Sequence, residues 1–224
     1  MVKYIAIIGD IKESKKLEER GQIQEKLDRC LKRINEIYCA DIASKYIITL
    51  GDEFQGLLKS TEHILDIIRY IQREMYPVRL RFGIGYGEVY TNIFFEAAIG
   101  ADGPAYYAAR ETIEKLHEQE KKLKTRAADI QISVYDTEDF EIAEINTILA
   151  LMKIIECGWS EKQRLTIWDM EQNGGSQEEC AKRIGTTQST VARRLADGNY
   201  LAYEMAGKTV NEALKRLGEI QNDS

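Results

Sequence analysis

A strand with a two-residue period is the feature that most limits how this chain can fold. Apolar residues alternate from Val78 to Tyr86, and the positions between them hold two arginines and then glycines, the last at Gly87. Side chains along a strand point to opposite faces in turn, so one face is apolar and the other carries Arg79, Arg81 and the glycines. Glycine weakens a strand, so this face indicates that a ligand, a second subunit or a packed helix approaches the backbone closely.

The pattern around this strand predicts an α/β (α+β) fold with a mixed sheet. Further strands are expected near residues 3–9, 45–50, 53–58 and 130–135, and helices near 23–37, 61–75 and 101–124. The resulting order is βαββαβ, then a helix and a strand. Only helices are expected from about residue 139. We therefore predict a sheet domain over 1–137, a connecting helix over 138–158 and an all-α domain over 159–224.

Two aspartates are candidate metal ligands because each is expected at a strand end. Asp10 follows the apolar run 4–9, and Asp52 lies in a Gly-Asp turn between two apolar runs, which predicts a hairpin. At neighbouring strand ends the two carboxylates would hold Mg²⁺ or Mn²⁺ against the phosphates of a nucleotide or other phosphorylated small molecule. Taken singly, each aspartate is better explained as a turn residue or helix cap.

The segment after Asp10 is a candidate phosphate site. Residues 11–16 include Ser14 and Lys15 and lead into a helix. Free N–H groups at a helix N-terminus bind phosphate, so Ser14 and Lys15 are predicted to contact the nucleotide.

Four segments in this order resemble motifs of the class III nucleotidyl cyclases. IIGDIKESKKL (7–17) resembles the first metal motif, and LGDEF (50–54) resembles the second and also the signature of GGDEF diguanylate cyclases. RFGIGYGEV (81–89) and GADGPAYYAAR (100–110) resemble a strand and a helix of the same domains. The resemblance covers about the first 125 residues. It implies a palm-like, ferredoxin-like domain with Asp10 and Asp52 as metal ligands, Arg110 as the cation that stabilises the transition state, and Glu53 assisting the metal or nucleophile.

Three positions depart from the cyclase pattern. Ile48 stands where purine-selective cyclases have a base-reading lysine, Tyr106 where they have an asparagine, and Glu13 where they have a phenylalanine. Loss of a transition-state donor costs about 10²–10³ in rate, so the departures favour metal and nucleotide binding without turnover, with Tyr106 stacking on a base. The alternatives are an active cyclase or polymerase-like enzyme that releases pyrophosphate, and a palm that only mediates protein contacts. Arg110 is equally well explained as a surface ion-pair partner.

Residues 176–195, SQEECAKRIGTTQSTVARRL, predict a helix-turn-helix. Ser176 and Glu179 form a capping box, Gly185 suits the turn, and Val191 and Leu195 would bury the second helix. The segment resembles the helix-turn-helix of sigma factors and resolvases. Its second helix would present side chains that read bases or hold phosphate, namely Gln188, Ser189, Thr190, Arg193 and Arg194. The alternative is a packing or dimerisation module.

Composition limits the partners and the compartment. The net charge of −6 argues against nucleic-acid binding by the whole surface, but residues 180–196 contain four basic and no acidic residues. No apolar run reaches the length of a membrane span or a signal peptide, and four scattered cysteines without a CxxC pair are expected to be free thiols. A palm-like domain followed by a helix-turn-helix resembles the SatD family. We expect a cytosolic bacterial regulator that binds a nucleotide and DNA as a homodimer.

Overall fold

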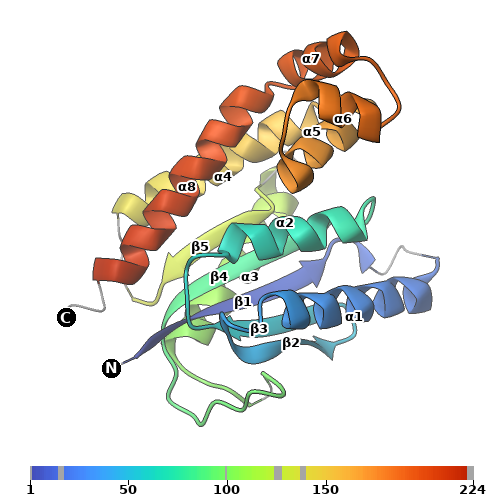
Figure 1. The fold of residues 1–224 in the computed structure, drawn as a ribbon. Coiled ribbons are helices and arrows are strands. Elements are labelled where there is room, and N and C mark those ends of the chain that lie inside the picture. The colour runs from blue at the N-terminus through green and yellow to red at the C-terminus, as the bar shows by residue number, and fades with distance from the viewer. Residues whose placement is uncertain (1, 15–17, 99, 124–127, 137–139, 221–224) are drawn as a thin grey trace.

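The computed structural model of the chain describes residues 2–14, 18–98, 100–123, 128–136 and 140–220, and its fold confirms the predicted class (Figure 1). A sheet domain comes first and an all-helical part follows. The sheet domain contains β1 (Lys3–Ile11), α1 (Arg20–Ile37), β2 (Ile42–Leu50), β3 (Glu53–Leu58), α2 (Ile64–Met75), β4 (Leu80–Glu88), α3 (Pro104–Leu123) and β5 (Ile130–Val134). The helical part contains α4 (Phe140–Cys157), α5 (Glu161–Asn173), α6 (Gln177–Arg183), α7 (Gln188–Asp197) and α8 (Tyr200–Ile220).

The five strands form one mixed sheet in the order β2-β3-β1-β4-β5. β1 is central and antiparallel to both β3 and β4, whereas β4 and β5 are parallel. The arrangement of the first four strands is that of the predicted ferredoxin-like βαββαβ core. Because β1 and β3 are neighbours, the end of β1 and the β2–β3 turn lie at the same end of the sheet.

Helices cover both faces of this sheet. The main core lies on the face covered by α1 and α2 and includes Ile5 and Ile7 of β1. Helix α3 covers the opposite face and packs against Ala6 and Ile8. The alternation of these four residues between the two cores follows from the two-residue period of a strand.

Helix α3 explains the glycine face of β4. A Cβ on Gly83 would overlap the carbonyl oxygen of Ala109, and a Cβ on Gly85 would overlap the carbonyl oxygen of Ala105. Of the three explanations left open by the sequence, the packed helix is the one found in this chain. Since α3 runs antiparallel to β4, the later turns of the helix lie over the end of the sheet that carries Asp10.

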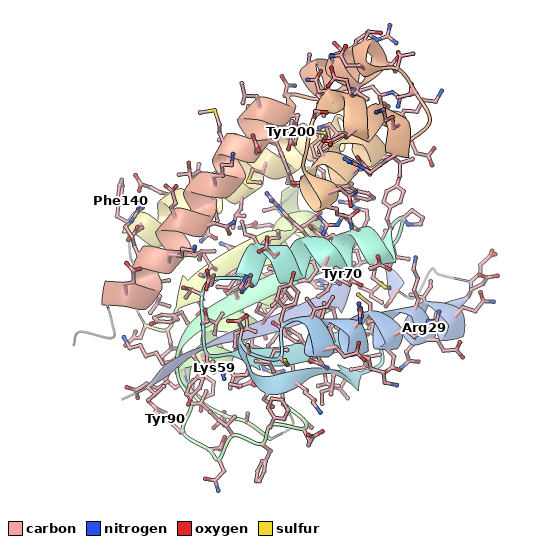
Figure 2. All side chains as sticks on the ribbon, viewed as in Figure 1. Arg29, Lys59, Tyr70, Tyr90, Phe140 and Tyr200 are labelled. Atoms are coloured by element: carbon pink, nitrogen blue, oxygen red, sulfur yellow. The ribbon has the colours of Figure 1, made fainter. Side chains whose placement is uncertain are left out.

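The helical part is tied to the sheet domain by α4 and α8. These helices are antiparallel, because Arg216 near the end of α8 pairs with Glu141 near the start of α4 at 3.2 Å. Figure 2 shows Phe140 and Tyr200, their first residues, at opposite ends of the helix pair. The sequence patterns did not single out α8, which begins in a second core with Tyr203 and ends in the main core with Leu217.

Within the described ranges no helix is both long enough and apolar enough to span a membrane. All four cysteines are free thiols, as expected.

Candidate functional site

The structure brings the backbones of the two candidate metal ligands together at one end of the sheet. Asp10 lies opposite Glu53 in the register of β1 and β3. The N–H group of Ile11 donates to the carbonyl oxygen of Asp52 at 3.2 Å. Burial raises the pKa of Asp10, and the negative charge of Asp52 adds to that rise.

Asp10 is held in an ion pair on the α3 face of the sheet. Its Oδ2 atom accepts a hydrogen bond from Nη1 of Arg81 at 2.7 Å and lies 3.6 Å from Nε2 of His117. This contact follows from register, because Asp10 is directly opposite Arg81 in the pairing of β1 with β4. Burial raises the pKa of Asp10, and the positive charge of Arg81 opposes that rise.

Asp52 faces a different environment, a cavity of about 280 Å³ at the start of α1. The cavity is also lined by Ser14, Arg20 and Gly21, so the predicted phosphate segment and the second carboxylate share one space. Helix α1 has no side-chain N-cap hydrogen bond and no acidic residue in its first turn. Since no side chain among the described residues caps α1, its N-terminal N–H groups could interact with an anion. Lys15 lies outside the described residues.

The donors at this end of the sheet fit a divalent cation that takes only part of its coordination from protein. Among the described residues, no group of three or more His, Cys, Asp or Glu side chains forms a complete metal site. Mg²⁺ in phosphate-binding sites commonly uses one or two carboxylates and fills the remaining positions with phosphate and water. Asp10 and Asp52 would supply the two carboxylates of such a site, Asp10 through the oxygen that does not accept from Arg81. Glu53 lies across from Asp10 and accepts from the Thr49 hydroxyl at 3.3 Å.

Arg110 and Tyr106 do not join the carboxylates in this chain. Arg110 is exposed on α3, seven residues before His117, and is therefore about 10 Å along the helix from the contact with Asp10. Tyr106 is only 3% exposed and packs against Ala6 and Ile8 in the core under α3. Its ring is therefore not accessible for stacking on a base, and the prediction for Tyr106 is corrected to a packing role.

Three titratable residues around Asp10 make contacts that the sequence did not predict. His117 and Glu120 both come from α3, and Lys12 follows β1; Lys12 and Arg81 each contact Glu120. The spacing of residues 117 and 120 places them on one face of a helix, but helix period alone cannot distinguish a face over a sheet end from a solvated face.

The C-terminal segment has the geometry of a helix-turn-helix. Ser176 and Glu179 form the predicted capping box of α6, and Gly185 in the turn has φ +66°. Thr187 caps α7 by accepting from the N–H group of Thr190. The apolar side of α7 is buried through Val191 and Leu195, as predicted.

The outer side of α7 carries the residues predicted to contact DNA, but they differ in exposure. Gln188, Ser189 and Arg193 are exposed, whereas Thr190 and Arg194 are half-buried. Nη1 of Arg194 donates to the hydroxyl of Thr166 in α5 at 3.2 Å. Arg193 is therefore the more available cation of the pair.

Comparison with solved structures shows a likeness to class III nucleotidyl cyclase domains over about half of the chain. One is a bacterial light-regulated adenylyl cyclase, 16% identical, with a TM-score of 0.41 over 59% of this chain and 76% of that chain. Another is the guanylyl cyclase domain of the RhoGC fusion protein from the aquatic fungus Blastocladiella emersonii, 13% identical, with a TM-score of 0.39 over 50% and 74%. A regulator of polyketide synthase expression from Bifidobacterium adolescentis, 16% identical, is matched over 96% of this chain and 81% of that chain with a TM-score of 0.28.

No curated protein matches the sequence. The family model for SatD matches residues 4–213, which is nearly the whole chain, and the chain belongs to the SatD family.

Proposed function

We propose that this SatD-family protein is a DNA-binding regulator whose sheet domain binds a phosphorylated ligand together with Mg²⁺. The observation that carries the proposal is the exposed polar edge of α7, formed by Gln188, Ser189 and Arg193 on a helix whose other side is buried. In helix-turn-helix proteins the N-terminal residues of the second helix contact base edges in the major groove. Glutamine suits adenine there, and arginine suits guanine or phosphate.

The acidic composition of the chain limits which part of the surface could bind DNA. A net charge of −6 excludes strong attraction of DNA to the molecule as a whole, so affinity must come from the local surface around α7. Within the segment 180–196, Arg183 is engaged by Asp169 at 2.7 Å, while Lys182 and Arg193 are exposed. With few exposed basic residues, one chain would make few phosphate contacts and bind DNA with modest affinity. A homodimer that places its two α7 helices on successive half-sites would raise the affinity.

DNA binding is tested by fluorescence anisotropy with a pool of labelled random duplexes over a range of salt concentrations. We expect binding that weakens as salt rises, and a loss of about tenfold or more in Gln188→Ala/Arg193→Ala. Lys208→Ala is the matched control, because it removes one positive charge from an exposed position of α8. Absence of binding at about 50 mM salt, or equal affinities for the double variant and the control, would contradict the proposal.

The ligand part of the proposal is supported by the cavity beside Asp52. Its volume of about 280 Å³ is close to the lower limit of small-molecule sites and could accept the phosphates and part of a nucleotide. Ser14 and the start of α1 would hold phosphate oxygens, and Asp10 and Asp52 would hold the cation. A bound Mg²⁺ would neutralise phosphate charge against these carboxylates.

The positions of two residues favour nucleotide binding over catalysis by this domain. The position where the cyclase pattern has asparagine is occupied by the buried Tyr106, and Arg110 lies about two helical turns from the residue that contacts Asp10. Thermal-shift measurements of the wild type with ATP, GTP and their cyclic and diphosphate forms, with and without Mg²⁺, test this part. We expect a rise in melting temperature that requires Mg²⁺ and is lost in Asp52→Asn. Pyrophosphate release from ATP or GTP would instead establish the enzymatic alternative.

A further inference from the structure

A series of ion pairs begins at Asp10 and continues through the interior of the sheet domain. Arg81 contacts Asp10 through Nη1 and Glu120 through Nε, at 2.7 and 3.1 Å. Lys12, whose side chain is 4% exposed, contacts both Glu120 and Asp129. The five side chains alternate in sign, and each inner member is shared by two partners of opposite charge.

The series then crosses into the helical part through Asp129. Lys153 of α4 contacts Asp129 and also Glu156, the latter at 3.4 Å. Glu156 in turn pairs with Nη1 of Arg164 in α5 at 2.6 Å. None of these four side chains is more than 16% exposed.

The far end of the series lies against the helix-turn-helix. The guanidinium group of Arg164 is 5.4 Å from the ring centres of both Trp159 and Trp168. The indole N–H of Trp159 donates to the carbonyl oxygen of Gly198, directly after α7, at 2.7 Å. A change in the position of Arg164 therefore acts on a tryptophan that is bonded to the end of the predicted DNA-contacting helix.

Burial distinguishes this series from the exposed ion pairs on the surface of the described residues, although Arg69 and Arg73 form a similarly buried pair of contacts with Glu171. The pair of Arg33 with Glu36 on α1, for comparison, has side chains that are 60% and 67% exposed, and water and salt screen such a pair. Charges in the interior are screened far less, so loss of one partner changes the balance of forces on the next.

We propose that this series couples the Asp10 site to α7, and that Arg81 is the residue that changes partners. When Asp10 binds a cation through its other oxygen, or is replaced by asparagine, its attraction for Arg81 falls and Arg81 pairs more strongly with Glu120, so Lys12 shares Glu120 with a more strongly bound competitor. Lys12 shifts toward Asp129, which weakens the hold of Asp129 on Lys153 and allows Lys153, Glu156 and Arg164 to readjust. On this proposal Arg81 has a second arrangement besides the observed one, in which it contacts both Asp10 and Glu120, and two such arrangements are what coupling between separate sites requires. The biological use of this coupling rests on the proposed function, but the coupling itself needs neither ligand nor DNA to be measured.

The two tryptophans of the chain make the test direct, because both contact Arg164. Tryptophan emission is compared between the wild type and Asp10→Asn, which removes the charge and keeps the shape. We expect a shift of the emission maximum in Asp10→Asn that is absent when the same change is made in a Glu156→Gln background. Substitutions at distant sites that share no partner normally act independently, so a dependence of the Asp10→Asn shift on Glu156 is the signature of coupling through the series.

Controls separate coupling from general loosening of the fold. Glu36→Gln, which breaks the exposed Arg33 pair, should leave the emission unchanged, and circular dichroism should show native helix content in each variant. Lys153→Gln replaces Glu156→Gln if the latter does not fold. An unchanged spectrum in Asp10→Asn, or an equal shift in both backgrounds, would overturn the proposal.

A second measurement links the series to function. DNA affinity of the wild type is measured with and without GTP and Mg²⁺, and we expect a change of about fivefold or more that is lost in Glu156→Gln. If the protein binds both DNA and GTP with Mg²⁺, but GTP with Mg²⁺ does not change the DNA affinity, the coupling is refuted while the proposed function stands. If neither binds, the proposed function fails, and the fluorescence comparison alone decides the coupling.

Discussion

The side chain of Asn146 in α4 makes two hydrogen bonds to the backbone of Ile132 in β5. Nδ2 donates to the carbonyl oxygen at 2.8 Å, and Oδ1 accepts from the N–H group at 2.8 Å. Asn35 of α1 makes the same pair of bonds to Tyr46 of β2, at 2.9 and 2.8 Å. Since β2 and β5 are the two edges of the sheet, an asparagine from a covering helix satisfies backbone groups at each edge.

We expect Asn146→Ala to lower the free energy of unfolding by about 1–3 kcal/mol, because it leaves a backbone donor and acceptor of β5 without partners. Urea denaturation followed by circular dichroism measures the change. Asn173→Ala is the matched control, since Asn173 is exposed and, among the described residues, its side chain bonds only to Asp169 one turn away. Equal stability of the two variants would show that the contact with β5 contributes nothing.

The close approach of α3 to β4 makes a second quantitative prediction. Gly85→Ala should lower the free energy of unfolding by at least about 2 kcal/mol, because the new methyl group meets the backbone of α3 at Ala105 and not a movable side chain. Gly21→Ala is the control: nothing lies within 4 Å of a Cβ there, and alanine favours the helix by up to about 1 kcal/mol. A neutral Gly85→Ala would contradict the packing of the two elements.

The alternating pattern around Arg81 shows which structural features the sequence can predict and which it cannot. Its period places Arg81 and the glycines on one face of a strand, and that is correct because side-chain direction in a strand is a local property. The partner of Arg81 depends on the register of β4 against β1, which no local pattern contains. The sequence therefore identifies Asp10 and Arg81 as residues of interest without predicting that they bond to each other.

The same limit applies to the helices. Caps and period define α6 and α7 closely, because Ser176, Gly185 and Thr187 act on their own neighbours. Tyr106, in contrast, lies between a proline-led helix start and an alanine pair that together resemble a cyclase motif, and only packing against the sheet shows that its ring is buried. Packing also decides that α8 joins both cores.

The ion pair between Asp169 of α5 and Arg183 of α6 is expected to make the free energy of unfolding depend on pH at low pH. Hydrogen bonds from Arg183 lower the pKa of Asp169 below its usual value. A group whose pKa is lower in the folded state adds stability above the pKa of the unfolded chain, about 3.8, and that stability is lost as the pH falls toward the folded value. We expect Asp169→Asn to lose about 1 kcal/mol at pH 7, since Arg183 is partly exposed, and to lose less below pH 4. Urea titrations at pH 7 and pH 3 measure this difference; an equal loss at both would refute the role of the ion pair.

Arg193 and Arg194 are adjacent in sequence but should have separable effects. Arg193 is exposed on the outer side of α7, whereas Arg194 is half-buried and donates to the Thr166 hydroxyl. If α7 enters the major groove, Arg193→Ala should weaken DNA binding by about 1–3 kcal/mol and leave the melting temperature unchanged. Arg194→Ala should lower the melting temperature, because it removes a bond between α5 and α7, and should affect DNA affinity less. Anisotropy with a labelled duplex and thermal denaturation of the same samples measure both effects. The reverse ranking of DNA affinities would mean that α7 meets DNA through the side that faces α5, which is incompatible with the packing of this helix-turn-helix.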